Sequence, residues 1–284
     1  MDKKDVIALI KDHEAKLDIE KSVLLPADDV LIHDMVREIN AAVNGRFRGY
    51  SDIVDQYIQG AGEIVLKYIF RLEKHMTRAS LLHHLVGNKT YAIKHVKHAP
   101  EVVWRLYEAF RDSEEYVDWG IQQYYDDAFV RLRSKALAER LIASIRNPLE
   151  FSALPRTVKM LATWKNPELE PILLDVLEHS EKMEAYLQTQ DVRERFAFDD
   201  QQIERECRRW STTAVLKAVI GIQHYPSQRA IQLLRQYEAD KLEEMQQKLL
   251  TCKNRTDKYD VQYDYSHILK TISKSIEQIN KVIG

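Results

Sequence analysis

The stretch FSALPRTVKMLATWKNPELEPILLDVLEHS, residues 151–180, decides the fold, because its pattern returns 59 residues later as WSTTAVLKAVIGIQHYPSQRAIQLLRQYEA, residues 210–239. The matching positions are Phe151 and Trp210, Ser152 and Ser211, Leu161 and Ile220, Pro167 and Pro226, and Ile172 and Ile231. Each copy is predicted to form a hairpin of two helices. The serine caps the first helix through its side-chain oxygen, and the proline opens the second, where its missing amide proton costs nothing.

A weaker third copy lies upstream of these two. Thr90, Pro100, Glu101, Val102, Leu106 and Phe110 align with Thr157, Pro167, Glu168, Leu169, Leu173 and Leu177. The sequence therefore predicts an all-helical fold, an irregular stack of antiparallel helical hairpins.

The composition agrees with a helical protein. The 284 residues are 45% apolar and 30% charged, and they include only 8 glycines and 7 prolines. The net charge of -2 gives no overall attraction to polyanions, so nucleic-acid binding would need a local basic patch. Only Cys207 and Cys252 are present, which favours a reducing compartment. No uncharged run reaches the roughly 18 residues of a membrane span. We therefore expect a cytoplasmic protein without membrane contact.

Outside the repeated stretch, we expect a helix after Pro26 that is capped by Asp28 or Asp29, runs through Val43 and stops at Asn44-Gly45. One long helix is expected over 114–146. A helix from Ser227 is expected to reach Leu250, followed by a loop over 251–265. The last helix carries Leu269, Ile272, Ile276, Ile279 and Ile283 at spacings of three and four. We expect it to fold back on the helix 227–250 and cover the end of the stack; a self-association seam is the alternative. The expected segments are 1–78, 79–250 and 251–284, forming one continuous structure.

With a proline at each turn between helices, segments 90–112, 151–180 and 210–240 resemble HEAT or armadillo-type repeats. Their offset is longer than the family's usual repeat of about 40 to 47 residues. The resemblance implies an α-solenoid in which each hairpin packs on its neighbours and the second helices line a concave face. HEAT-like proteins are mostly scaffolds and adaptors. The resemblance therefore implies a non-enzymatic role in binding a protein partner.

Exposed tryptophan, arginine and acidic side chains on such a face are the expected contacts, because aromatic and arginine side chains anchor many interfaces. Trp104 lies off the apolar stripe of its helix and is expected to project from it. The predicted contact residues are Trp104, Arg105, Glu108, Glu170, Asp175, Arg229 and Arg235.

Two histidine patterns are candidate metal sites. Five histidines fall between residues 75 and 98, namely His75, His83, His84, His95 and His98. A site needs three of them to converge, and Lys94 and Lys97 would oppose a cation. His33-Asp34 resembles the pair of the HD phosphohydrolases, but the surrounding motif is missing around His13 and Asp52. We expect no metal and no cofactor.

Nucleic-acid binding is the second functional hypothesis, in the manner of the HEAT-like DNA glycosylases. Basic residues cluster as Arg131, Arg133, Lys135 and Arg140, and as Arg205, Arg208 and Arg209. Both clusters alternate with acidic residues at helical spacing, which favours pairing along the helix. A glycosylase would also need a groove carboxylate, and Asp118 beside Trp119 is the one pair that invites this role.

Other catalytic motifs are missing from the sequence. It contains no glycine-rich phosphate loop, no GxSxG elbow, no CxxC and no HExxH. A binding protein is therefore favoured over an enzyme.

Overall fold

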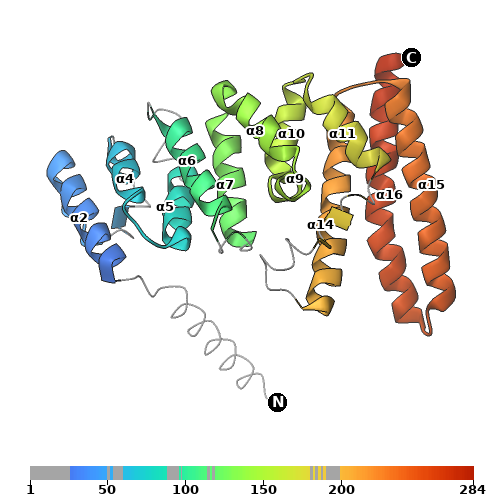
Figure 1. Ribbon diagram of the computed structural model, residues 1–284, viewed down its shortest axis with the longest axis horizontal. Helices are drawn as coiled ribbons and strands as arrows, with labels where there is room; N and C mark the ends of the chain where they lie inside the picture. Colours follow the sequence, from blue (N-terminus) through green and yellow to red (C-terminus); the bar gives the residue numbers. More distant parts are fainter. Residues whose placement is uncertain are drawn as a thin grey trace. The chain divides into compact units, whose positions relative to one another are not determined.

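The computed structural model describes residues 26–49, 52–53, 60–87, 96, 98–113, 116, 119–179, 182, 185–186, 188–189 and 199–284, without the side chains of 26, 83–87, 119, 200 and 202–211. All regular elements in these ranges are helices, which confirms the predicted all-helical class (Figure 1). None of the described helices is long and apolar enough to cross a membrane. The chain divides into two compact units, Met1–Phe110 and Arg111–Gly284. This boundary differs from the segment boundaries expected after residues 78 and 250.

The first unit contains α2 (Pro26–Val43), α4 (Ala61–Ile69), α5 (His75–Gly87) and most of α6 (Ala99–Arg111). Helix α2 packs against α4, and α4 packs against α5. The side chain of Asp28 in α2 is fully buried and contacts the residues just before α5. Its carboxylate accepts hydrogen bonds from Glu73 N at 2.7 Å and from Lys74 N at 3.3 Å. One buried side chain thus joins two helices.

The predicted helix and its stop are confirmed, but the helix begins at Pro26, so the expected caps Asp28 and Asp29 lie inside its first turn. Asn44 adopts φ 52°, the left-handed conformation that commonly ends helices. The side-chain amide of Asn40 then holds the returning chain, because it accepts from Phe47 N and donates to Phe47 O, both at 2.8 Å. Local sequence was sufficient to place this end.

The second unit contains α7 (Trp119–Leu132), η3 (Lys135–Leu137), α8 (Ala138–Ile145), α9 (Pro148–Ala153), α10 (Pro155–Thr163), α11 (Leu169–Glu178), α14 (Asp200–Ile222), α15 (Gln228–Thr251) and α16 (Arg255–Ile283). Helix α14 is central, because it packs against α9, α10, α11 and α16. Helix α10 also packs against α7, and α11 also packs against α15. The residues at the middle of this core are Phe129, Leu161, Leu173, Ile222 and Leu234.

Two buried carboxylates fix the helices before and around α10. Asp126 of α7 accepts from Arg156 N at 2.9 Å and from Thr157 N at 2.8 Å, so it caps α10 from another helix. Glu150 of α9 accepts from Tyr116 Oη at 2.7 Å and from Ser144 Oγ at 3.1 Å. Buried charges of this kind require hydrogen-bond partners, and both have them.

The prediction of one long helix over 114–146 is wrong. Helix α7 ends at Leu132, Arg133 takes φ 48°, and η3 and α8 follow. A non-glycine residue in the left-handed region ends the helical hydrogen bonding there, and no glycine or proline in the local sequence announces it.

The predicted serine caps of the hairpins are also wrong. Ser152 lies buried inside α9, α10 begins at Pro155 instead, and Ser211 lies within α14. In the second copy, the cap belongs to the second helix, α15, where Ser227 Oγ accepts from Ala230 N at 3.1 Å. In the first copy, Asn166 Oδ1 accepts from Glu168 N at 3.0 Å in the turn before α11. The side-chain acceptors therefore lie in the turns before the second helices, and Ser152 and Ser211 do not begin the first helices.

The C-terminal region gives one confirmed expectation and one error. The helix from Ser227 runs to Thr251, and the contact of the last helix with it is confirmed, since α15 and α16 lie side by side (Figure 1). Ile272 and Ile279 are fully buried there. The loop predicted over 251–265 is wrong, because α16 already begins at Arg255. Asn254 caps it by accepting from Asp257 N at 2.8 Å.

Candidate functional site

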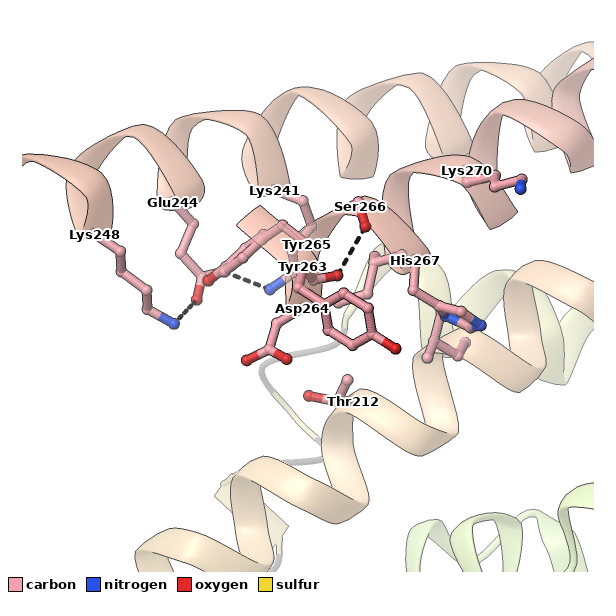
Figure 2. Close-up of a pocket in the computed structure, with 12 residues that line it drawn as sticks. Thr212, Lys241, Glu244, Lys248, Tyr263, Asp264, Tyr265, Ser266, His267 and Lys270 are labelled. Carbon is pink, nitrogen blue, oxygen red and sulfur yellow. Dashed lines mark hydrogen bonds and ion pairs between the residues drawn. The ribbon is translucent and has the colours of Figure 1, made fainter. Parts of the chain in front are cut away.

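A cleft of about 630 Å³ opens where α14, α15 and α16 meet in the second unit (Figure 2). Helix α14 contributes Thr212 and Leu216 to its lining. From α15 come Lys241, Glu244 and Lys248, and α16 contributes residues 263–268 and Lys270. The lining therefore mixes aromatic, basic and acidic side chains.

Glu244 is the centre of the charged side of the cleft. Its Oε2 accepts from Lys241 Nζ at 2.6 Å and its Oε1 accepts from Lys248 Nζ at 3.0 Å. The hydroxyl of Tyr265, a residue only 5% exposed, bonds to the same carboxylate. Lys248 Nζ also lies 5.0 Å from the centre of the Tyr265 ring, within the range of a cation-π contact. Four side chains from two helices thus form one network.

This network shifts the titration of its members. Burial would raise the pKa of Glu244, but hydrogen bonds from Lys241, Tyr265 and Lys248 and the charge of Lys241 lower the pKa to about 2. The pKa of Lys248 is raised by its hydrogen bonds to Tyr265 and Glu244, which outweigh burial. Burial, followed by the bond to Glu244, raises the pKa of Tyr265. At neutral pH the network therefore holds one carboxylate, two ammonium groups and a neutral phenol.

Glu244 and Tyr265 are poorly suited to proton transfer near neutral pH. A carboxylate with a pKa of about 2 that is held by two ammonium groups is a weak proton acceptor near neutral pH. The phenol beside it stays protonated, because its pKa is raised. Neither group is tuned to transfer a proton at neutral pH.

Two exposed tyrosines extend from the cleft along α16. Tyr263 lines the cleft and is 68% exposed, and Tyr259, one turn earlier, is 65% exposed. Their ring centres are 6.3 Å apart and the rings are inclined by 22°, so they form a stacked pair. Figure 2 shows the Tyr263 ring projecting between α16 and Thr212 of α14. We call Tyr259 and Tyr263 the tyrosine pair.

The expectation that Trp104 projects from its helix is wrong. Trp104 is only 6% exposed, and its ring lies 6.1 Å from that of Tyr107. Helix α6 buries Val103, Trp104, Leu106 and Tyr107 together, so its covered face is wider than the apolar stripe suggested. Trp104 is therefore buried in the free chain.

The other six predicted contact residues are partly or fully exposed. Arg105 is exposed beside Glu101, with 3.1 Å between Arg105 Nε and Glu101 Oε1, and Glu108 is half-buried. In the second unit, Glu170 is half-buried, while Asp175, Arg229 and Arg235 are exposed.

Two of these six residues form ion pairs with other side chains of the second unit. Arg229 Nη2 of α15 lies 2.5 Å from Glu178 Oε2 of α11, and Asp175 Oδ1 lies 3.8 Å from Lys182 Nζ. The charges of Arg229 and Asp175 are therefore balanced within the chain.

The structure does not assemble a metal site in the part it describes. No group of three or more histidine, cysteine, aspartate or glutamate side chains converges among the described residues. His75 lies against Phe110, with 5.8 Å between the ring centres, and His98 is exposed. His95 and the side chains of His83 and His84 lie outside the described residues.

The predicted His33-Asp34 pair forms ordinary surface contacts. His33 Nδ1 lies 2.9 Å from Asp29 O, and Asp34 pairs with Arg37. Asp52 accepts from Arg48 N at 2.8 Å, and His13 lies outside the described residues.

The predicted nucleic-acid residues fall into two groups. Arg131, Arg133, Lys135 and Arg140 are all exposed. Asp118 and the side chains of Trp119, Arg205, Arg208 and Arg209 lie outside the described residues.

Sequence reasoning missed the cleft. The tyrosine pair and Tyr265 lie in the segment 251–265 that was predicted to be a loop. The signal that would have found them is the spacing of Tyr259 and Tyr263, which are four residues apart and so share one face of a helix. Asn254 before this run is a helix start signal.

The comparisons with known proteins give no relative. No protein-family model, no curated protein and no solved structure matches the chain.

Proposed function

We propose that the protein is a non-enzymatic scaffold or adaptor that binds a protein partner at the cleft between α14, α15 and α16. The tyrosine pair carries this proposal. Two stacked, exposed tyrosines beside a cleft are a preformed anchor, because a tyrosine buries a large area on binding and loses little side-chain entropy. The mixed charges of Lys270, Asp264 and the Glu244 network suit the polar surroundings of such an anchor.

We also propose that the second unit is built as a HEAT-like stack. Helices α10 and α14 contain the first-helix segments of the two copies, α11 and α15 contain the second, and each packs on its counterpart. Tyr225 and Asn166, at equivalent positions 59 residues apart, are joined by a hydrogen bond of 2.7 Å. Gly221 supports the close packing of α14 on α11, because a Cβ there would lie 3.0 Å from Leu173 Cδ1.

The face formed by the second helices, α11 and α15, stays a prediction and is the alternative to the cleft as the binding surface. It would present Glu170, Asp175, Arg229 and Arg235 from α11 and α15. Two of these four are already ion-paired within the chain, so a partner would have to replace existing contacts. The tyrosine pair needs no such exchange, which is why the cleft is favoured.

Site-specific photo-crosslinking in cells distinguishes these surfaces. A photoreactive phenylalanine analogue is placed at Tyr263 in the cleft, at Arg235 on the second-helix face, or at Val30 of the first unit, which is 60% exposed. We expect a discrete crosslinked protein from position 263 and none from position 30. The same product should weaken when Tyr259 is also changed to Ala and persist when it is changed to Phe.

The outcomes separate the proposals. Crosslinking from position 235 alone would move the binding site to the second-helix face. Equal crosslinking from all three positions, or none from 263 and 235, would count against a dedicated protein-binding surface.

A further inference from the structure

A row of basic side chains follows the contact between α10 and α14 in the second unit. Arg156 and Lys159 come from α10, Lys165 from the turn after it, Lys217 from α14 and His224 from the turn after α14. Arg156, Lys159 and Lys165 are exposed, while Lys217 and His224 are half-buried. We call these five residues the basic row. None of them lines the cleft.

The members of the basic row are close enough to repel one another. Burial lowers the pKa of Lys217, and the charges of Lys159 and Arg156 lower it further. Burial lowers the pKa of His224 as well, followed by the charges of Lys165 and Lys159.

The packing of the chain places these residues together. Helix α10, with the exposed Arg156 and Lys159, packs directly against α14, which carries Lys217. The hydrogen bond of 2.7 Å from Tyr225 Oη to Asn166 O joins the two turns that contain His224 and Lys165.

The acidic residues near the basic row are already engaged. Asp127 pairs with Arg156. Asp126 is buried, and its two oxygens accept from Arg156 N and Thr157 N at the start of α10. The charge of Asp126 favours the ammonium form of Lys217. Among the described residues, no carboxylate forms an ion pair with Lys159, Lys165 or Lys217.

A half-buried lysine that pairs with no carboxylate in the described part of the chain, and that lies next to two further cations, opposes folding in the free protein. An anionic ligand would remove this cost by adding the missing negative charge. We infer that the basic row is a second docking surface, which binds a short acidic segment of a partner protein. This surface goes beyond the cleft proposed above and does not depend on it.

The size of the row favours an acidic protein segment over nucleic acid. Helix α10 has 9 residues, which corresponds to a length of about 13 Å. An extended peptide covers that distance with about four residues, at about 3.3 Å each. A protein that neutralises about six to ten phosphates of a DNA duplex needs more cationic side chains than the four lysine and arginine residues of the basic row.

Fluorescence anisotropy with a labelled peptide of six glutamates tests the inference, with a peptide of six glutamines as its neutral match. The full chain should bind the glutamate peptide and release it as salt is raised from about 0.05 M to about 0.3 M, because exposed ion pairs are screened. The variant Lys159→Gln, Lys165→Gln, Lys217→Gln should bind it about tenfold more weakly.

The matched control removes the same charge elsewhere. In the variant Lys253→Gln, Lys258→Gln, Lys274→Gln, three exposed lysines of the C-terminal region are replaced, and peptide affinity should be unchanged. If the first triple variant does not fold by circular dichroism, the double variant of the exposed Lys159 and Lys165 replaces it. Equal loss in row and control variants, or no binding of the glutamate peptide, would overturn the inference.

Two further measurements fix the site and the class of ligand. Bound peptide should raise the pKa of His224, followed by NMR of its imidazole, because added negative charge offsets Lys165 and Lys159. An unchanged His224 titration would place the peptide elsewhere.

A labelled DNA duplex is measured in parallel. Tighter binding of the duplex, lost in the same row variant, would replace the acidic segment with nucleic acid.

Discussion

Tyr225 Oη donates a hydrogen bond of 2.7 Å to the backbone oxygen of Asn166, 59 residues earlier in the chain. The two residues occupy equivalent positions in the two copies, each just before the proline of its turn. Tyr225 is only 8% exposed, and burial, followed by the charge of Glu170, raises its pKa to about 12. The bond therefore ties the turn of one hairpin to the turn of the next.

Changing Tyr225 to Phe should lower the free energy of unfolding by about 1 kcal/mol, because the Asn166 oxygen loses its donor while the ring still packs. Urea denaturation measures the change. The raised pKa adds a pH signature: the neutral phenol is favoured by the folded state, so its stabilisation is present below pH 10 and is lost as pH rises to about 12. The loss of wild-type stability over this range should be smaller in the variant. Tyr259→Phe, at an exposed position, is the control and should change neither quantity.

Changing Asp126 to Ala should destabilise the second unit by about 2 kcal/mol, because a buried and a part-buried backbone donor at the start of α10 lose their acceptor. Asp28→Ala removes the corresponding contact in the first unit. Hydrogen exchange of backbone amides should show faster exchange around α10 in the first variant and around α5 in the second. Identical exchange maps would contradict the assignment of one cap to each unit.

Changing Glu244 to Gln should lower stability at neutral pH by about 1 kcal/mol, a value reduced for the solvent exposure of this side chain. Because the pKa falls from 4.5 to about 2 on folding, the contribution of Glu244 is complete above pH 4.5 and disappears as pH approaches 2. The difference between wild type and variant in urea denaturation should therefore shrink over that range. Glu277→Gln removes a more exposed pair with Lys281 and should have a smaller effect. A difference independent of pH would argue against the ionised network.

Changing Ile279 to Ala should cost about 3 kcal/mol, because the residue is fully buried and the change leaves a cavity. Val282→Ala, three residues later and 67% exposed, should change stability by less than about 0.5 kcal/mol. Thermal and urea unfolding measure both variants. If the two substitutions cost the same, α16 does not pack through the face that contains Ile272 and Ile279.

The sequence alone determined the helical class and the helices whose ends are encoded locally. The end of the first of these helices was placed because Asn44 provides its left-handed stop, and the helix from Ser227 was placed because its apolar residues recur at helical spacing. The break at Arg133 was missed, because its left-handed conformation has no glycine or proline signal. The start of α16 was missed because a polar, tyrosine-containing run was interpreted as a loop, although Asn254 caps it.

Only the tertiary structure decided which faces of these helices are covered. Trp104 is buried, although the local sequence predicted that it projects from its helix. The tyrosine pair is exposed on a helix, although its segment was predicted to be a loop. The cleft and the basic row each combine side chains from segments far apart in the chain, such as Thr212 with Tyr263, or Lys159 with Lys217. Helical periodicity fixes which residues share a face of one helix. Which neighbour covers that face depends on long-range packing, and the spacing of residues within one helix carries no information about it.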